Sequence, residues 1–229
     1  MSFLGAIKGR LAIGKQAKGD IVGAKKLYEE AIAGGMTHPH YMLAYSVLLL
    51  KDGEYEKAKA LLVKTQKAPG ITDAQKQQLF MNYAVACYKL GDLNRALELM
   101  EKQHEKNPSG LIYGTLGYLY VEKGDAEKAL AYNQQALEYD DQDPIVLDNM
   151  GQTYYRLLGD KKTAKQYFES ALKLKPGQID TLYYLAQYDL EAGNKEAAKE
   201  KLEKALEGRF SPLNHATPEL LKKALENIQ

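Results

Sequence analysis

Residues 113–136 read YGTLGYLYVEKGDAEKALAYNQQA, and within them Gly124 is followed five positions later by Ala129. The same spacing occurs six times along the chain, at Gly19/Ala24, Gly53/Ala58, Gly91/Ala96, Gly124/Ala129, Gly159/Ala164 and Gly193/Ala198. Successive glycines therefore recur with a nearly constant step, and only the step from Gly53 to Gly91 is clearly longer. Because self-similarity of this length is typical of solenoids, the sequence predicts an array of about six structural repeats.

Each repeat is predicted to be a helical hairpin, because apolar residues recur three and four positions apart on both sides of each glycine. Six of the seven prolines fall 16 to 20 residues after a repeat glycine, where a helix break would end one hairpin before the next helix begins. We treat 1–229 as a single domain with repeats at approximately 5–38, 39–76, 77–109, 110–143, 144–178 and 179–212. A capping helix is expected at 217–229.

The glycine and the alanine have separate physical roles. A tight turn between two helices commonly needs a residue with positive φ, which costs glycine no steric penalty. The alanine lets the second helix approach its neighbour closely, and a larger residue nine after the glycine fills the space around it. These larger residues are Tyr28, Leu62, Met100, Phe168 and Leu202, with the polar Asn133 as the exception.

The repeat resembles the tetratricopeptide repeat, whose signature joins a large residue, Leu-Gly, an aromatic residue, alanine and proline over about 34 residues. The best copies contain Tyr113, Leu116-Gly117, Tyr120, Gly124, Ala129 and Ala136, and then Leu147, Met150-Gly151, Tyr154-Tyr155, Ala164, Phe168, Ala171 and Pro176. The resemblance covers nearly the whole chain. It implies an all-α, right-handed solenoid whose first helices line a concave groove for a peptide or helix of another protein.

Two departures from the regular spacing predict local irregularities. The long step from Gly53 to Gly91 predicts a longer connection at roughly Lys67 to Asp73. Gly151 and Gly159 are separated by one position more than the matching pairs of the other repeats, so we expect a helix irregularity near Leu157 and Leu158.

Composition excludes several function classes. The chain has 31 basic and 30 acidic residues and a net charge of +1, so it lacks the broad positive field that attracts nucleic acid. The one cysteine, Cys87, excludes an intramolecular disulfide and favours a cytoplasmic location. The longest nearly apolar stretch, Tyr41 to Leu50, is about half of the roughly 20 residues that span a membrane. The amino terminus lacks the pattern of a secretory signal.

The resemblance places the groove at the positions ten, six, three and two before each repeat glycine, and one position further back in the fifth repeat. These are Leu43, Val47, Leu50, Lys51, Met81, Val85, Tyr88, Lys89, Gly114, Tyr118, Val121, Glu122, Asp148, Gln152, Tyr155, Arg156, Tyr183, Gln187, Leu190 and Glu191. The first half is apolar and aromatic, and the second mixes tyrosine with amides and charges, which suits an amphipathic helix or an extended segment with apolar anchors. The alternative is that part of this set belongs to the core, because neighbouring faces of a stacked helix are both partly buried.

Basic side chains near the predicted groove give a weaker indication of the ligand. Lys51, Lys89 and Arg156 are candidates for capturing an acidic peptide terminus, although charges on helical repeats usually form a solvated face. The family's carboxylate clamp is not supported, because its positions hold Ile13, Val47 and Val85.

No metal site or catalytic group is predicted. His38 and His40 lack a third ligand nearby, and the acidic run at 140–143 lacks the glycine and glutamate of a calcium loop. Cys87 has no base beside it and is interpreted as a small apolar core residue.

The amino-terminal helix is a second candidate surface. It has an apolar stripe and a basic side, formed respectively by Phe3, Leu4, Ile7 and Leu11 and by Lys8, Arg10, Lys15 and Lys18. Such helices bind anionic membranes, and the alternative is that this stretch is simply the first helix of the first repeat, packed on the second.

We therefore expect a non-catalytic cytoplasmic scaffold, without cofactor or metal, that binds a peptide or amphipathic helix of another protein. Nucleic acid is not an expected partner. A self-associating structural array and a membrane-peripheral assembly factor that uses the basic amino-terminal helix are the alternatives.

Overall fold

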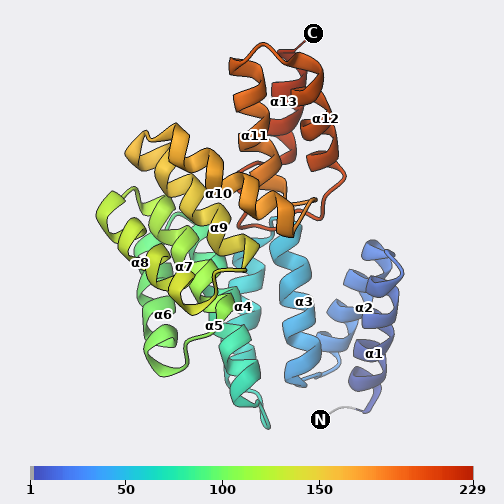
Figure 1. Cartoon of the computed structure of the whole chain (residues 1–229). Coiled ribbons are helices and arrows are strands. Elements are labelled where there is room, and N and C mark those ends of the chain that lie inside the picture. The colour runs from blue at the N-terminus through green and yellow to red at the C-terminus, as the bar shows by residue number, and fades with distance from the viewer. Residues whose placement is uncertain (1–2, 229) are drawn as a thin grey trace. The chain divides into compact units, whose positions relative to one another are not determined.

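A computed structural model describes residues 3–228, and over this range the chain forms helices joined by short connections, with no strand (Figure 1). The helices in chain order are α1 (Phe3–Ala17), α2 (Ile21–Ala33), α3 (Pro39–Lys51), α4 (Tyr55–Gln66), α5 (Asp73–Lys89), α6 (Leu93–Lys106), α7 (Gly110–Lys123), α8 (Ala126–Tyr139), α9 (Pro144–Gln152), η1 (Thr153–Leu158), α10 (Lys161–Leu174), α11 (Ile179–Glu191), α12 (Lys195–Leu206) and α13 (Pro218–Glu226). The predicted all-α class is confirmed.

The repeat glycines lie between the two helices of each hairpin. All six have positive φ, between +69° and +86°. A Cβ atom added to any of them would meet no atom within 4 Å, so the backbone conformation, and not the available space, requires glycine at these positions. The predicted role of these glycines is confirmed.

The repeat alanines and the residues that follow them form the core. Ala24, Ala58, Ala96, Ala129, Ala164 and Ala198 all have 0% exposure, as do the six residues nine positions after the glycines. Asn133 belongs to this buried set, and its amide group lies beside Gly117, where a Cβ atom would be only 2.1 Å from Asn133 Oδ1. The glycine of the Leu-Gly pair therefore makes room for a buried polar side chain in this repeat.

Hydrogen bonds join residues that lie about one repeat apart in the sequence. Asn149 Nδ2 donates to Gly114 O at 2.8 Å, and Gln178 Nε2 donates to Pro144 O at 2.8 Å. These partners are 35 and 34 residues apart in sequence. Stacking therefore brings corresponding positions of neighbouring repeats into contact, as expected when hairpins bury their apolar faces on one another.

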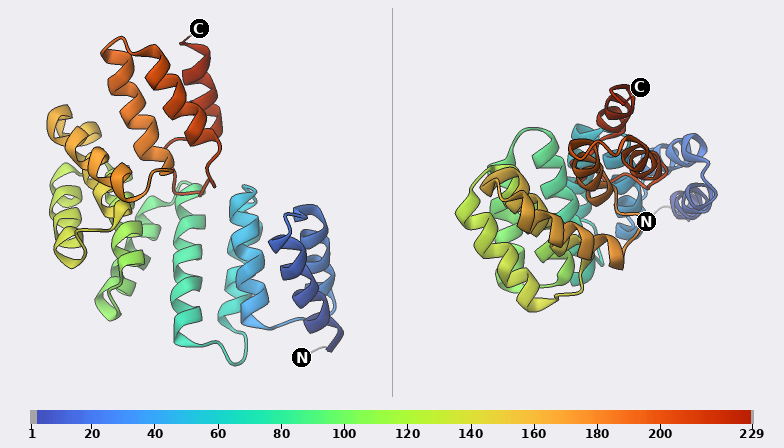
Figure 2. Two further views of the ribbon diagram at one scale, coloured as in Figure 1. Left: turned by 45° about the vertical axis from the view of Figure 1, so that its right-hand side comes forward. Right: turned by 45° about the horizontal axis from the view of Figure 1, so that its top comes forward.

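The helices group into two compact units, of which unit 1 ends at Gln103 and unit 2 begins at His104. In unit 1, α1 packs against α2, and α3 packs against both α4 and α5. In unit 2, α7 packs against α8 and α9, and α11 and α12 pack against each other, as do α12 and α13. Figure 2 shows the successive helices of each hairpin running in opposite directions. The single-domain organisation proposed for 1–229 stays a prediction.

Both predicted irregularities are confirmed. The connection between α4 and α5 is long and contains Gly70, with φ of +74°. Residues Thr153–Leu158 form the π-helix η1, and Asp160 N donates to Tyr154 O at 3.0 Å across its end. The wider turn accommodates the additional residue before Gly159 without shifting the repeats on either side.

The last helix, α13, covers the end of unit 2. Thr217 Oγ1 accepts a hydrogen bond from Leu220 N at 3.2 Å, and Pro218 occupies the first helical turn. Leu221 is fully buried in a cluster that includes Ile179 and Leu202. Residue 229, the end of the predicted capping helix, lies outside the described residues.

Candidate functional site

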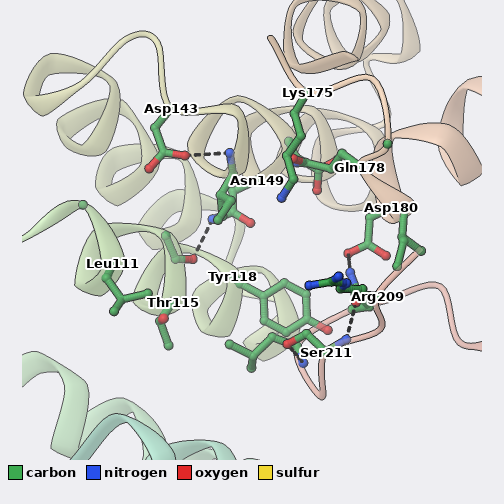
Figure 3. A pocket seen from close by; sticks show the side chains of 18 residues that line it. Leu111, Thr115, Tyr118, Asp143, Asn149, Lys175, Gln178, Asp180, Arg209 and Ser211 are labelled. Carbon is green, nitrogen blue, oxygen red and sulfur yellow. Dashed lines mark hydrogen bonds between the residues drawn. The ribbon is translucent and has the colours of Figure 1, made fainter. Parts of the chain in front are cut away.

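A pocket of about 680 Å³ lies in unit 2 on the side of the first helices (Figure 3). Its walls come from the first half of α7, the beginning of α9, the connection from α10 into α11, and the connection from α12 to α13. Side-chain caps fix two of these helix ends, because Ile112 N donates to Ser109 Oγ and Ile145 N donates to Asp143 Oδ1 at 2.8 Å.

Apolar side chains and glycines form much of the lining. Leu111 and Ile145, from α7 and α9, are 55% and 43% exposed. Gly114 and Gly177 keep the pocket open, because neither contributes a side chain to it. A Cβ atom at Gly114 would lie 3.0 Å from Ile145 Cγ2, whereas one at Gly177 would meet nothing within 4 Å.

Two buried carboxyl groups, Asp148 and Asp180, line the pocket and have hydrogen-bond partners. Asp148 accepts from Gln152 Nε2 at 2.7 Å and from Thr181 Oγ1 at 2.5 Å. Asp180 accepts from three donors of the α12–α13 connection, which are Ala216 N at 2.8 Å, His215 N at 3.1 Å and Asn214 Nδ2 at 3.2 Å.

Burial changes the titration of this pair. Desolvation, and then the nearby charge of Asp180, raises the pKa of Asp148 to about 7. Desolvation also raises the pKa of Asp180, although its three donors act in the opposite direction. Near neutral pH the pair therefore carries less than two negative charges.

Lys175 and Arg209 are the basic residues of the lining. Both are exposed, and among residues 3–228 neither side chain forms an ion pair or a hydrogen bond. In Figure 3 the Lys175 amine extends toward the middle of the pocket, and Arg209 is drawn beside Tyr118 and Asp180. The lining thus contains two cationic side chains without an ion-pair partner among residues 3–228, together with three aspartates that are hydrogen-bonded elsewhere.

We call residues 207–217, which connect α12 to α13, the strap. Its His215 ring stacks on Tyr184 of α11, with centroids 5.5 Å apart, and His215 Nδ1 lies 3.9 Å from Glu122 Oε1 of α7. Burial, together with the Arg156 charge, lowers the pKa of His215 to about 4, so the imidazole is neutral at pH 7. The strap therefore spans part of the inner face between α7 and α11.

The predicted groove residues of unit 2 fall into three environments. Gly114, Tyr118 and Asp148 line the pocket. Gln152 is fully buried, and Arg156 donates to Gln152 Oε1 at 3.0 Å and to Glu122 Oε1 at 2.6 Å. The remaining residues are buried or half-buried outside the pocket lining, namely Val121, Tyr155, Tyr183, Gln187 and Leu190, while Glu191 is exposed and pairs with Lys161.

The predicted groove residues of unit 1 also differ in their exposure. Leu43 and Val47 line a second cavity of about 370 Å³ between α3 and α5. Leu50, Met81 and Val85 are buried, Tyr88 and Lys89 are half-buried, and Lys51 is exposed. The assignment of either set to partner binding stays a prediction. Because Arg156 is engaged by Glu122, it is not a free cation for an acidic peptide terminus.

Of the pocket lining, the spacing argument predicted only Gly114, Tyr118 and Asp148, and the missed residues include Leu111, Ile145, Lys175 and Arg209. Leu111 and Ile145 lie three positions before the predicted groove residues Gly114 and Asp148. Lys175 and Arg209 follow their own repeat glycines at the same distance, so they occupy equivalent positions of adjacent repeats. Comparing this connection position across repeats would have revealed a basic residue in the last two repeats only.

The other candidate sites have structural roles. His38 and His40 flank the start of α3, with ring centroids 6.4 Å apart, and no group of three or more His, Cys, Asp or Glu residues suited to a metal ion occurs within the described range 3–228. Asp143, at the end of the acidic run, caps α9. Cys87 is fully buried, and burial raises the pKa of its thiol.

The amino-terminal helix α1 contacts its neighbours through small residues. Gly5, Gly9 and Ala12 are buried, while Leu4, Ile7 and Leu11 are 65%, 44% and 56% exposed. The helix packs against α2, as the alternative interpretation of this stretch expects, but these three residues are not part of that contact. The side chain of Phe3 lies outside the described part of the chain. No helix within residues 3–228 has both the length and the apolarity that crossing a membrane requires.

Comparison with known families gives one match. The model described as "Tetratricopeptide repeat" matches residues 111–143 and 146–178, which cover most of α7 to α10 and part of the pocket lining. No curated protein matches the sequence.

Several solved structures share the fold. A tetratricopeptide repeat protein from Parabacteroides merdae is 17% identical, with a TM-score of 0.78 over 98% of this chain and 84% of its own. A thermophilic TPR protein of Thermus thermophilus is 23% identical, with a TM-score of 0.66 over 83% of this chain and 98% of its own. PilW, described as a widely conserved type IV pilus biogenesis factor, is 18% identical, with a TM-score of 0.68 over 98% of this chain and 100% of its own.

Proposed function

Because this chain is a tetratricopeptide repeat protein, and such proteins generally mediate protein–protein interactions, we propose that it is a non-catalytic scaffold that binds a peptide or helix of a partner protein. The pocket of unit 2 is the proposed binding site. The cytoplasmic location and self-association stay predictions, and light scattering over a range of concentrations tests the second.

The observation that supports this proposal most is the pair of exposed aliphatic side chains, Leu111 and Ile145, at one pocket. They belong to the first helices of adjacent repeats, so one ligand side chain can contact both. Full burial of an aliphatic side chain is worth about 1.5–3 kcal/mol, and covering two half-exposed ones gives a similar total. That gain favours an apolar anchor residue in the ligand.

A peptide selection tests the proposal. A library of random dodecapeptides is displayed on phage, selected on the full chain, and the enriched peptides are measured by fluorescence polarisation. The double variant Leu111→Glu/Ile145→Glu should bind these peptides at least about tenfold more weakly, because one lost apolar anchor already accounts for that factor. Its helicity should be unchanged, since both side chains are already exposed.

The matched control is Leu158→Glu/Leu174→Glu, which changes two leucines of 42% and 43% exposure that do not line the pocket. This control should bind as the wild type does. Failure to enrich any peptide, or equal affinities for the two double variants, would reject the pocket as the binding site.

The exposed stripe of α1 supports a second candidate function, binding to an anionic membrane surface. Leu4, Ile7 and Leu11 lie on one side of the helix, and Arg10 and Lys18 are exposed basic residues near them. Co-sedimentation with phosphatidylserine-containing liposomes should be strong for the wild type and weak for Ile7→Asp. Val22→Asp, which alters an 83% exposed residue of α2, is the control and should behave as the wild type. Absence of sedimentation with the wild type rejects this candidate.

A further inference from the structure

The first helices of the six repeats have one equivalent face, which holds the positions twelve, eight and five before the repeat glycine, and one position further back in the fifth repeat. We call this the stacking face. In the five later repeats Tyr41, Tyr83 and Tyr188 are its half-buried members, and all its other residues are at most 5% exposed. The later repeats therefore keep this face covered, as expected where hairpins stack on one another.

In the first repeat the stacking face is open. Ile7 and Leu11 occupy it and are 44% and 56% exposed, and its third residue, Gly14, is exposed as well. Leu4, about one turn earlier on the same side of α1, is 65% exposed. In Figure 1, α1 lies at the edge of unit 1. Aliphatic side chains thus remain in water at positions that no later repeat leaves exposed.

A helix of the preceding hairpin covers the stacking face in the later repeats, through the residue nine after its own glycine. Tyr45 stacks on Tyr28 of α2, with ring centroids 4.9 Å apart, and Leu79 packs in one cluster with Leu62 of α4. The residue nine after the glycine follows the repeat alanine by four positions. A covering helix therefore carries a small residue and, four positions later, a large one, and this spacing puts both on the same side of the helix.

A second copy of this chain does not offer such a helix. The residues nine after the glycines all have 0% exposure, so each second helix already uses this side within its own chain. At the end of unit 2, for example, Leu202 of α12 packs in one cluster with Leu221 of α13. Two α1 helices also suit each other poorly, because α1 contains Lys8, Arg10 and Lys15 and no acidic residue, and like charges repel.

The charges beside the open stacking face indicate which partner helix fits it. Lys15 lies on one side and is paired with Asp20. Arg10 lies on the other side, and Lys18 follows Gly14 by about one turn. The side chains of Arg10 and Lys18 are exposed and form no ion pair or hydrogen bond among residues 3–228. Acidic residues at the flanks of a partner helix would complement these two cations.

We propose that the open stacking face of α1 binds an acidic amphipathic helix of another protein, which lies across Ile7, Leu11 and Gly14 as a preceding repeat's second helix would. The partner helix buries a small residue and a large apolar residue against α1, and its flanking carboxylates pair with Arg10 and Lys18. The burial of the equivalent face by a helix in the later repeats favours this occupant over a membrane surface. The site belongs to unit 1 and goes beyond the pocket of unit 2, which is the binding site of the proposed function.

The helix α4 provides the template for the probes, because it packs on α5, whose stacking face ends in the small Ala86 as that of α1 ends in Gly14. The acidic probe copies residues 54–66 with all lysines replaced by glutamate, and a hydrocarbon staple on the side opposite Ala58 and Leu62 keeps it helical. The basic probe keeps the lysines and has its glutamates replaced by lysine. The third probe is the acidic one with Leu62→Ala.

Each probe is titrated into the full chain while the backbone amide signals of Ile7, Leu11 and Gly14 are followed by NMR. The acidic probe should shift these signals with the highest affinity. The Leu62→Ala probe should bind about tenfold more weakly, because it lacks the large apolar residue. The basic probe should bind at least about threefold more weakly, as expected when exposed ion pairs are replaced by like charges.

Variants of the chain assign the binding to the stacking face. Ile7→Asp/Leu11→Asp should bind the acidic probe at least about tenfold more weakly, and its helicity should be unchanged because both side chains are already exposed. The matched control is Val63→Asp/Leu174→Asp, which changes aliphatic residues of 44% and 43% exposure on α4 and α10 and should bind as the wild type does.

A second pair of variants tests the charges. Arg10→Gln/Lys18→Gln should lower the preference for the acidic over the basic probe at least about threefold. Lys173→Gln/Lys204→Gln makes the same change of charge at exposed lysines of α10 and α12, and it should keep the wild-type preference.

Several results would overturn the inference. If no probe shifts the α1 signals at millimolar concentration, or if Ile7→Asp/Leu11→Asp binds the acidic probe as the wild type does, the stacking face does not bind a helix. Co-sedimentation of the wild type with phosphatidylserine-containing liposomes, without a shift by any probe, would make a membrane the occupant. A dimer in light scattering that Ile7→Asp/Leu11→Asp dissociates would make a second copy the occupant. These results leave the test of the unit 2 pocket unaffected, because that test uses other residues and separately selected peptides.

Discussion

Asp148 shows how one residue of unit 2 links burial to pH. The residue is 4% exposed, and desolvation raises its pKa to about 7, whereas an aspartate in an unfolded chain titrates near about 4. Between these values the native state binds more protons than the unfolded state. The free energy of unfolding therefore falls as the pH rises from about 4 to about 7, and this contribution is constant at higher pH.

The variant Asp148→Asn tests this linkage. The amide has nearly the same shape and has no proton to lose, so the decrease in unfolding free energy between pH 5 and pH 8 should become smaller. One unit of pKa difference is worth about 1.4 kcal/mol, and we expect the change to be at least of that order. Urea denaturation at a series of pH values measures it. Asp141→Asn, at an exposed position of the α8–α9 connection, should leave the pH dependence as it is. An unaltered pH dependence in Asp148→Asn would contradict the assignment.

The same residue shows what the sequence can and cannot predict about the site. Repeat spacing correctly grouped Asp148 with Gly114 and Tyr118, because corresponding positions of stacked helices share a face. It could not predict that Asp148 is buried, because its donor Thr181 and its neighbour Asp180 belong to the next repeat. Lys175 and Arg209 were missed because they lie in or at the start of connections, whose conformation helical periodicity does not specify.

At the scale of elements, the sequence predicted most of the fold. The glycine positions, the long connection before α5 and the π-helix η1 all follow from counting residues, because each extra residue must be absorbed locally if neighbouring repeats are to stay stacked. The sequence left open whether the apolar stripe of α1 is exposed. Its amphipathic pattern identifies an apolar stripe, but small residues on the other side of the helix, Gly5, Gly9 and Ala12, make the contacts with its neighbours.

The capping helix α13 gives the element-scale prediction. Leu221 has 0% exposure, whereas most of the other side chains of this short helix are exposed or half-buried. Leu221→Ala should therefore lower the stability of unit 2 by about 2–5 kcal/mol, which is usual when a buried leucine is truncated. Thermal melts followed by circular dichroism measure the midpoint. Leu174→Ala, at a leucine with 43% exposure on α10, should change it far less. Equal midpoints for Leu221→Ala and the wild type would show that α13 does not protect the end of the array.

At the scale of the whole molecule, the two compact units suggest that the effects of a substitution stay local. In a repeat array each hairpin is stabilised mainly by its nearest neighbours, so stability is approximately a sum of local contributions. The first four helices, α1 to α4, and the helices α7 to α9 belong to different units. A destabilising change in unit 2 should therefore leave local opening in α1 to α4 unaffected.

Gly117→Ala is suited to test this, because a Cβ atom at this position would lie 2.1 Å from Asn133 Oδ1 and 3.1 Å from Asn149 Nδ2. Hydrogen exchange measured by mass spectrometry should become faster in peptides of α7, α8 and α9, since relieving the clash must disturb the amides of both asparagines. Peptides of α1 to α4 should exchange at the wild-type rate. Gly177→Ala, where no atom lies within 4 Å of the added carbon, is the control and should change neither region. Faster exchange along the whole chain in Gly117→Ala would mean that the repeats unfold cooperatively. The prediction that destabilisation of unit 2 leaves α1 to α4 unaffected would then be wrong.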